Sequence, residues 1–488
     1  MAEETINEND SEVILSLISH TNVGKTALAR TLLRRDVGEV ADRAHVTVAS
    51  EAYTLIETDG LVTKLWDTPG FGSNLAKLAK RIRSSGNPVG WIMHQVWDRF
   101  KDESLWCSQE AIRNIKEDAD LVLYLVDASQ SPGTIGYVDL EMEILSWIGK
   151  PVLVFLNQTG RPEPDRIARE EQEWSDHLAE LDIVKSVSTL DAFTRCWTQE
   201  HHVLEKAAEH IDGKKKQTAE KLARAWTQRN LDVFEKSLNE ISDLFVFSLL
   251  DTEKLKENSV ASKLKNLVGK NDQDSEMEKV QQNMYRRLAE RTAETINRLI
   301  ANHGLDGQTA RELARSSQDE FTYSRNVEES LAAAVGGAVS GLVAGLSADL
   351  IAGGATFGGG AVMGMLLGAG TTYALAKGYN LTQTGVNEVR WTEAQFESQV
   401  KFIIMLYLAV AHFGRGRGAW QDPENNPGHW EDTTDEIIQA NKEALHNLWK
   451  KGGADGKSEK LKKEVRSKVR VLLTSALVKL YPDSAKIF

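Results

Sequence analysis

The sequence predicts an α/β domain with a mostly parallel sheet and helices on both faces, followed by a mainly α-helical region. Continuous apolar runs of strand length occur at Leu121–Val126 and Val152–Leu156, and such runs are typical of strands buried on both faces. The apolar run Val13–Ile18 leads through a loop into a helix-forming stretch, Thr26–Arg35. Beyond residue 200, apolar residues recur at helical spacing, as in Ala219–Phe247, which indicates amphipathic helices.

Two further segments complete the predicted sheet. Leu61–Trp66 is expected to pair with Tyr53–Glu57, and Ile183–Val187 is expected to be the last strand. A chain of 488 residues is too long for one ordinary core, so several domains are expected. We divide the chain into an α/β domain at 1–200, a helical bundle at 201–328, a Gly-rich apolar hairpin at 329–378 and a C-terminal helical region at 379–488.

Composition excludes some classes of function. Lys and Arg number 58 against 71 Asp and Glu, and this net charge of −13 argues against a general nucleic-acid binder, so no nucleic-acid partner is expected. Cys107 and Cys196 are the only cysteines and lack metal-ligand spacing, which favours a reducing cytoplasm. The acidic, polar N-terminal stretch lacks the features of a secretory signal, so we expect a cytoplasmic protein.

A phosphate-binding loop is predicted directly after the first strand. Residues 19–26 read Ser-His-Thr-Asn-Val-Gly-Lys-Thr, which fits the pattern GxxxxGK[ST] except that Ser19 replaces the first glycine. In this motif the backbone N–H groups surround the phosphates, the lysine neutralises the β- and γ-phosphates, and the final hydroxyl ligates Mg²⁺. The residues predicted to contact a nucleoside triphosphate here are Ser19, His20, Thr21, Asn22, Val23, Gly24, Lys25, Thr26 and Ala27. The motif and its strand–loop–helix context predict a P-loop NTPase domain.

An acidic partner for the loop follows the strand Leu61–Trp66. In Asp67-Thr68-Pro69-Gly70, the Asp67 carboxylate is placed to hold Mg²⁺ through water, and Gly70 is placed to offer its N–H to the γ-phosphate. Asp, Pro and Gly also form ordinary turns, which is the alternative for this segment taken alone. The Mg²⁺ ligands expected from the residues are therefore Thr26 and Asp67.

The residues Asn22–Thr26 followed by Asp67–Gly70 resemble the Era/TrmE-like branch of the translation-factor-related GTPases. Within that branch the layout resembles an uncharacterised bacterial group in which a helical region with a Gly-rich apolar hairpin follows the GTPase domain. The resemblance implies GTP and GDP as ligands and hydrolysis of GTP to GDP and phosphate.

The same resemblance implies roles for single residues. A switch threonine, Thr47 or alternatively Thr54, would close on Mg²⁺, so Thr47 joins Lys25 and Gly70 as a candidate catalytic residue. Asn22 would help to hold a monovalent cation, K⁺. Phe71 stands where Ras-like enzymes carry a catalytic Gln, which implies slow intrinsic hydrolysis.

The base-reading motif departs from the family pattern. After the strand Val152–Leu156 the expected [NT]KxD is replaced by Asn157-Gln158-Thr159-Gly160, which lacks the aspartate that accepts hydrogen bonds from guanine. Asn157 and Gln158 remain candidate base contacts, and Ser188 and Thr189 are candidates from the last base-contacting loop. Guanine thus follows from the resemblance, and an ATP-specific protein remains an alternative.

A Gly-rich apolar segment interrupts the helical region. Residues 331–376 contain one charged residue, Asp349, and small residues recur every four positions, as at Gly337, Gly341 and Gly345. This length and spacing predict a helical hairpin that enters a bilayer, with 329–378 binding the inner face of the cytoplasmic membrane or a membrane-protein partner. The alternative is a soluble hairpin buried in a domain or subunit core.

Two functional hypotheses follow. The first is a GTPase switch coupled to a membrane-associated helical region. The second is a nucleotide-gated structural protein that self-assembles into a homo-oligomer and hydrolyses little, which the replaced catalytic Gln and the altered base motif allow.

Overall fold

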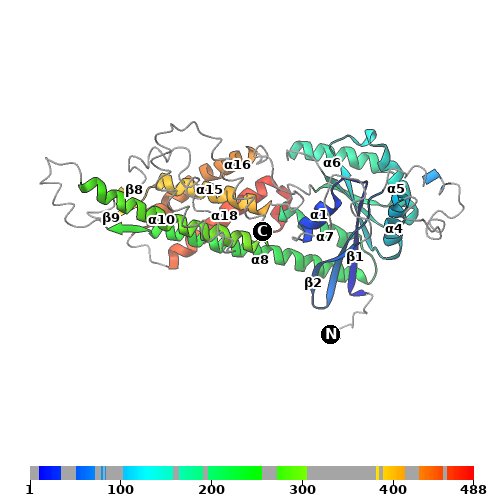
Figure 1. The fold of residues 1–488 in the computed structure, drawn as a ribbon, viewed down its shortest axis with the longest axis horizontal. Coiled ribbons are helices and arrows are strands. Elements are labelled where there is room, and N and C mark those ends of the chain that lie inside the picture. The colour runs from blue at the N-terminus through cyan, green and yellow to red at the C-terminus, as the bar shows by residue number, and fades with distance from the viewer. Residues whose placement is uncertain are drawn as a thin grey trace. The chain divides into compact units, whose positions relative to one another are not determined.

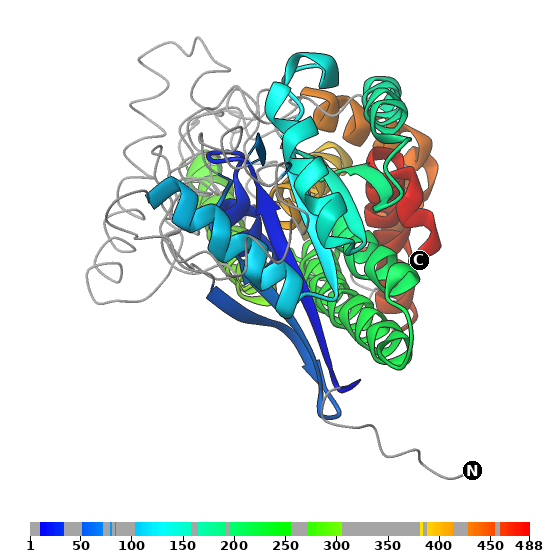
Figure 2. The same ribbon diagram turned by 90° about the vertical axis from the view of Figure 1, so that its right-hand side faces the viewer.

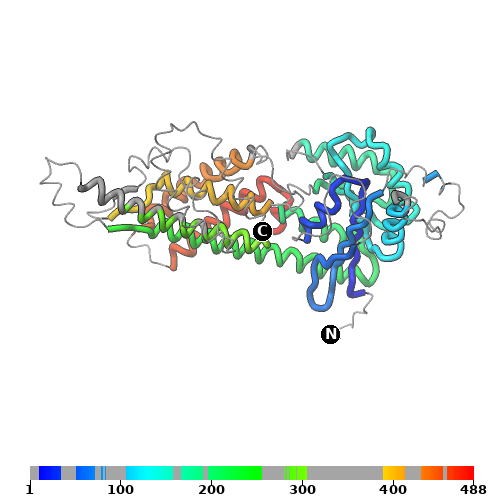
Figure 3. Tube along the Cα trace, in the orientation of Figure 1, coloured from blue at the N-terminus to red at the C-terminus, as the bar shows by residue number. Residues whose placement is uncertain are grey.

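The computed structural model describes two compact units of the 488-residue chain. Unit 1 comprises Met1–Leu231 with His412–Gly418, and unit 2 comprises Asp232–Ala411 with Ala419–Phe488. The residues that the structure describes are 10–33, 51–71, 79–80, 83, 103–157, 164–190, 196–254, 272–304, 381–383, 388–412, 428–453 and 459–488. Figure 3 traces the chain through both units.

Unit 1 is built on a six-stranded sheet in the order β2-β3-β1-β4-β5-β6. Its strands are β1 Glu12–Ser19, β2 Glu51–Thr58, β3 Leu61–Asp67, β4 Leu121–Asp127, β5 Val152–Asn157 and β6 Val184–Thr189. β1 is parallel to β3 and β4, β4 to β5, and β5 to β6, whereas β2 is antiparallel to β3. The predicted fold class is confirmed, and all six segments that we expected to be strands lie in this sheet.

Helices cover both faces of the sheet (Figure 1, Figure 2). These helices are α1 Lys25–Leu33, α4 Glu103–Glu117, α5 Gly136–Ile148, α6 Pro164–Leu178 and α7 Trp197–His210, with a short 3-10 helix η2 at Pro132–Thr134. One core cluster joins α1, α7 and the start of α8 (Lys215–Leu250) to one face, and a second joins α4, α5 and α6 to the other. Strands covered on both faces bury alternate residues in both clusters, which explains why β4 and β5 are apolar throughout.

The core of unit 1 continues past the boundary that we expected at residue 200. Leu204 and Ala207 of α7, and Leu222 and Trp226 of α8, belong to the cluster that contains Leu28 of α1. Burying these side chains against the sheet favours a larger α/β unit, and unit 1 extends to Leu231, within α8.

Unit 2 is mainly helical. It contains the second part of α8, α10 Asp272–Asn302, α15 Glu393–Ala411, α16 Gly428–Ala440, α17 Lys442–Lys451, α18 Glu459–Leu480 and a 3-10 helix η4 at Pro482–Lys486. Aromatic side chains join α8 to α15, because Phe234 lies against Tyr407 and Phe245 against Phe396, with ring centroids 6.2 and 5.7 Å apart.

A small antiparallel sheet in unit 2 adds strands to the region after residue 379, for which we expected helices with one loop-like interruption. β9 Glu388–Trp391 pairs with β7 Thr252–Lys254 on one side and with β8 Leu381–Gln383 on the other. The β7–β9 pairing joins segments more than a hundred residues apart, so local spacing gave no sign of it. Trp391 Nε1 donates to Asp251 Oδ2 (2.9 Å), which fixes the sheet to the end of α8.

Several sequence predictions lie outside the described residues. These are the hairpin at 329–378, the switch threonine Thr47 and the base contact Gln158. Among the residues that the structure does describe, no helix has the length and apolar character needed to cross a membrane.

Candidate nucleotide site

The phosphate loop connects β1 to α1 at the carboxyl edge of the sheet, where parallel α/β folds bind their ligands. Asn22 and Gly24 have positive φ angles of 64° and 101°. Asparagine tolerates the left-handed region better than most residues, and glycine carries no Cβ to clash there. A Cβ on Gly24 would lie 2.8 Å from Asn157 Nδ2, so both backbone shape and packing require glycine.

Lys25 opens α1 with its side chain buried beside the loop. Its Nζ donates to Ser19 Oγ (3.2 Å), and Ser19 Oγ donates to the carbonyl of His20 (2.5 Å). Burial lowers the pKa of Lys25, while the nearby carboxylates of Asp67 and Glu141 act in the opposite direction. The loop therefore holds an ammonium group in a poorly solvated place, where a phosphate would supply the compensating charge.

Thr26 and Asp67, the two residues predicted to serve Mg²⁺, are in direct contact. Thr26 Oγ1 donates to Asp67 Oδ2 (2.7 Å), and Asp67 is the last residue of β3. Burial raises the pKa of Asp67, and its Oδ1 is buried with no hydrogen-bond partner among the described residues. A carboxylate oxygen and a hydroxyl are hard ligands that suit Mg²⁺, so this donor set fits the metal that the motif implies.

The turn after Asp67 lies directly against the phosphate loop. Phe71 N donates to Ser19 O (2.9 Å), and Thr21 N donates to Phe71 O (3.3 Å). A Cβ on Gly70 would lie 2.7 Å from Lys25 Nζ, so the two motifs are in contact. The Phe71 side chain is fully buried in the core under α4 and α5, which leaves it no access to a water nucleophile.

The side chain of His20 points into the domain, where it meets residues that the sequence analysis did not find. Its Nδ1 donates to Glu141 Oε1 (2.7 Å), and its ring stacks on Tyr137 at a centroid distance of 4.0 Å. Tyr124 Oη donates to the other oxygen of Glu141 (2.6 Å). Burial raises the pKa of Glu141, and the bonds from His20 and Tyr124 and the charge of Lys25 oppose this shift. We predicted His20 only as a nucleotide contact. A Glu at helical spacing from the apolar residues Val138 and Leu145 of α5 is the sequence signal that would have pointed to Glu141.

Asn157 supports the loop from β5. Its Nδ2 donates to the carbonyl of Val23 (2.6 Å), and the side chain is fully buried. Thr189 ends β6 beside it, with its backbone N–H bonded to Glu171 and its Oγ1 buried without a hydrogen-bond partner in the described structure. The structure thus brings Asn157 to the loop, while base contacts by Asn157, Ser188 and Thr189 stay predictions.

Thr54, the alternative switch threonine, is an exposed residue of β2. Thr54 pairs with Lys64, and Glu51 of the same strand pairs with Asp67. Thr54 therefore lies three residues along β2 from the partner of Asp67. Searching the described residues for three or more clustered His, Cys, Asp or Glu side chains gives no further metal site.

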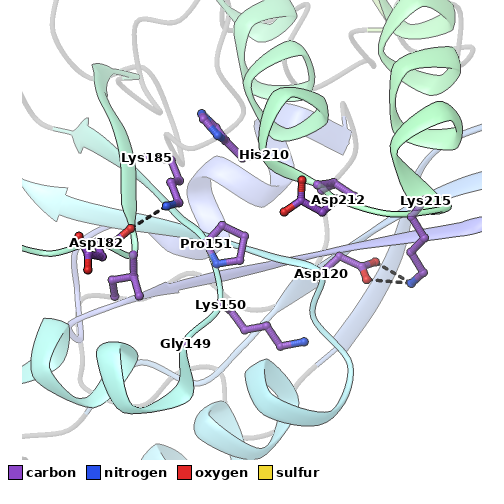
Figure 4. Close-up of a pocket in the computed structure, with 11 residues that line it drawn as sticks. Asp120, Gly149, Lys150, Pro151, Asp182, Lys185, His210, Asp212 and Lys215 are labelled. Carbon is purple, nitrogen blue, oxygen red and sulfur yellow. Dashed lines mark hydrogen bonds and ion pairs between the residues drawn. The ribbon is translucent and has the colours of Figure 1, made fainter.

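A second pocket, of about 480 Å³, opens at the amino ends of β4, β5 and β6, opposite the phosphate loop (Figure 4). Its charged groups are largely paired: Lys215 Nζ lies 2.8 Å from both oxygens of Asp120, and Lys185 Nζ donates to the carbonyl of Asp182 (2.7 Å). Burial lowers the pKa of Lys150, which donates to the carbonyl of Ala119 (2.6 Å). This balance of charge gives the pocket no clear preference for an anion.

Two family models match parts of this chain. Residues 15–158 match the family model described as 50S ribosome-binding GTPase, and residues 176–478 match the model described as domain of unknown function DUF3482. The chain therefore carries a GTPase-family domain followed by a DUF3482 region. No protein in the curated set matches the sequence.

Solved structures that resemble part of this chain include Era and a probable GTP-binding protein. An Era variant from Aquifex aeolicus bound to GDP and AlF4⁻ is 16% identical, with 41% of this chain and 57% of that chain covered and a TM-score of 0.31. Era in complex with MgGDPNP and nucleotides 1506–1542 of 16S ribosomal RNA gives 17% identity, the same coverage and a TM-score of 0.31. A probable GTP-binding protein, engB, is 18% identical over 41% of this chain and 98% of its own, with a TM-score of 0.26.

The chain thus spans little more than half the length of the Era structures that it matches. One of those structures contains ribosomal RNA. Our expectation from net charge that this chain binds no nucleic acid stays a prediction.

Proposed function

Because this chain belongs to the family of the domain of unknown function DUF3482 and carries a GTPase-family domain, we propose that it is a GTP-binding switch that hydrolyses GTP to GDP and phosphate. The convergence of Lys25, Thr26 and Asp67 at the end of β1 and β3 is the observation that carries this proposal. A buried ammonium group beside a hydroxyl and a carboxylate oxygen that has no hydrogen-bond partner among the described residues suits a magnesium-bound triphosphate.

The chemistry of this site follows from where its charges lie. Lys25 and the N–H groups at the start of α1 stabilise the negative charge that develops on the phosphate oxygens as the β–γ bond breaks. Thr26 would ligate Mg²⁺ directly and Asp67 through water, and the metal would neutralise the phosphate oxygens. Gly70 would offer its N–H to the γ-phosphate, and Thr47 would close the site as the switch threonine.

Slow intrinsic hydrolysis is part of the proposal. The Phe71 side chain is buried in the core and has no group that activates water. Activation of the attacking water therefore requires a group other than residue 71. Asn22 is our candidate for holding a K⁺ ion that assists the reaction. Comparing turnover in KCl and NaCl tests this role, and equal rates in the two salts would remove it.

Nucleotide binding by purified wild type and Lys25→Ala tests the central proposal. We expect Lys25→Ala to lose most of its affinity for fluorescent GDP and GTP analogues, because it removes the charge that meets the phosphates. Lys214→Ala is the matched control, since that lysine is 81% exposed and lies 3.9 Å from Asp10. Equal binding by Lys25→Ala and wild type would contradict the proposal, and displacement of the analogue by ATP in preference to GTP would contradict guanine specificity.

The partner of the switch is proposed on sequence grounds. The hairpin at 329–378 would bind the cytoplasmic membrane or a membrane protein, and deletion of 331–376 tests this by fractionation. A deletion variant that stays as membrane-bound as the full chain would exclude insertion. If turnover is negligible and nucleotide instead changes the sedimentation of the chain, the second candidate, a nucleotide-gated self-assembling protein, is supported.

A further inference from the structure

Glu141 is a fully buried carboxylate that the nucleotide motifs do not include. It lies on α5, inside the core cluster formed by Val138, Met142 and Leu145 of the same helix. A buried carboxylate is destabilising unless it is hydrogen-bonded, so a residue of this kind in an apolar helix face needs a reason. Its two oxygens are both bonded, one to the phosphate loop and one to the sheet.

The contacts define a chain of hydrogen bonds from β4 to the phosphate loop. Tyr124 Oη donates to Glu141 Oε2 (2.6 Å), and Tyr124 is fully buried in β4. His20 Nδ1 donates to Glu141 Oε1 (2.7 Å), and Tyr137 stacks on the imidazole with an interplanar angle of 14°. The hydrogen bond to Glu141 therefore restrains the imidazole within its ring plane, and the stacking on Tyr137 restrains it perpendicular to that plane.

Fixing His20 fixes the first part of the phosphate loop. The backbone on either side of His20 is also bonded to Phe71, through Ser19 O and Thr21 N. The loop between β1 and the left-handed residue Asn22 is thus held by the turn after β3 and, through the histidine ring, by α5. Loops of this kind bind phosphate with backbone N–H groups, which must be oriented before the ligand arrives.

We propose that Glu141 is a positioning residue for nucleotide binding: with Tyr124 it holds His20, and through His20 it holds the phosphate loop in its binding conformation. This inference rests on the proposed function. It assigns to α5 a role that the loop motifs do not contain.

The test uses the full chain with Glu141→Gln, Glu141→Ala and Tyr124→Phe. Asp139→Asn is the matched control, because Asp139 lies on the same helix, is 70% exposed and bonds only outward to His177 in the described structure (2.9 Å). Equilibrium titration with fluorescent GDP and GTP analogues at low temperature gives Kd, thermal unfolding gives Tm, and GTP turnover gives kcat.

We expect Glu141→Ala to raise Kd for GDP and GTP together, by roughly 10- to 100-fold, because a charge-assisted hydrogen bond is lost and His20 is released. Glu141→Gln keeps an acceptor for His20 and should restore part of this loss, to within roughly tenfold of wild type. His20 holds the part of the loop around Ser19 and Thr21, whereas the developing charge is stabilised by Lys25 and the start of α1, so kcat at saturating GTP should stay within roughly twofold of wild type. A residue that only stabilises the fold would lower Tm without this split between Kd and kcat.

Tyr124→Phe keeps the aromatic ring and removes only the hydroxyl, so it tests the same chain if Glu141→Ala fails to fold. Unchanged Kd in Glu141→Ala, or in Tyr124→Phe where Glu141→Ala fails to fold, would overturn the inference, as would an equal rise in Asp139→Asn. If Lys25→Ala loses binding while these variants match wild type, only this inference falls. If wild type and Lys25→Ala bind equally, the proposed function falls and this inference with it.

Discussion

A methyl group added at Gly70 tests whether the turn after Asp67 and the phosphate loop form one closely fitted site. The Cβ of Gly70→Ala would lie 2.7 Å from Lys25 Nζ, 3.2 Å from Thr21 N and 3.3 Å from Ser19 O. The first contact is closer than real Cβ atoms approach, and the other two involve backbone atoms of the loop. The lysine has a flexible side chain, but it is buried and already bonded to Ser19.

The expected loss of affinity depends on whether the turn can move away from the phosphate loop. Turn and loop are joined by two backbone hydrogen bonds, Phe71 N to Ser19 O and Thr21 N to Phe71 O, so the turn cannot shift away without weakening them. Overpacking of a closely fitted site typically costs about 1–3 kcal/mol. If the strain falls on the binding conformation, affinity drops by roughly 5- to 150-fold. We expect a larger loss for GTP than for GDP, because the Gly70 N–H faces only the γ-phosphate in our proposal.

Titration of wild type and Gly70→Ala with fluorescent GDP and GTP analogues measures this effect. Gly136→Ala is the control, since a Cβ at Gly136 meets nothing within 4 Å and the residue has no left-handed φ. The control should bind like wild type. Affinity of Gly70→Ala for the GTP analogue within about twofold of wild type would refute the reasoning, because the turn would then be free to move away from the loop.

Other substitutions give further checks. Gly24→Ala places a Cβ in the left-handed region at φ 101° and should lower the free energy of unfolding in urea by at least about 1–2 kcal/mol. Asn157→Ala removes the hydrogen bond to the loop and should weaken GTP and ATP analogues equally, by roughly fivefold, whereas a loss confined to GTP would show that Asn157 reads the base. Burial raises the pKa of Glu141, so its contribution to the stability of wild type is fully present below the ordinary carboxyl pKa and is lost as pH rises through the folded value. Relative to wild type, Glu141→Gln should therefore gain stability in urea unfolding as pH rises above the ordinary carboxyl pKa, and a parallel pH dependence would contradict this. Arg390→Lys loses two hydrogen bonds to carbonyls at the end of α17 and the stacking on Trp449, and should destabilise unit 2 by about 1–3 kcal/mol in urea, an effect that unchanged unfolding would exclude.

The features that the sequence predicted depend on neighbours along the chain. The runs at Leu121–Val126 and Val152–Leu156 are apolar because both faces of β4 and β5 are covered, and this pattern is visible within six residues. The phosphate loop is visible in the same way, because Gly24, Lys25 and Thr26 act at fixed spacing. The strands and the loop were therefore placed without knowledge of the tertiary structure.

The features that escaped prediction depend on distant contacts. The sheet of β7, β8 and β9 joins Thr252 to Arg390, and no local pattern reports such a pairing. Glu141 has the spacing of an ordinary helix residue, and its role becomes visible only when α5 lies beside His20, 121 positions earlier in the chain. Charged residues on helices are usually exposed, so sequence reasoning treats them as solvent-facing by default.

The support of the phosphate loop explains why some of its residues were found and others were not. The loop contains two left-handed residues, Asn22 and Gly24, and an unsupported loop of this shape would lose the conformation that the phosphates need. Support comes from Asn157, Phe71 and His20 with Glu141. Asn157 ends β5 and the turn before Phe71 follows β3, so both lie at the carboxyl edge of the sheet. Ligands bind at this edge in open α/β sheets, which makes residues there predictable from sequence. Glu141 reaches the loop from the interior of a helix. In our proposal, the binding site therefore includes a helix residue that supports the phosphate loop from the interior of the domain. Residues of this kind are found by examining the buried charged side chains near the loop.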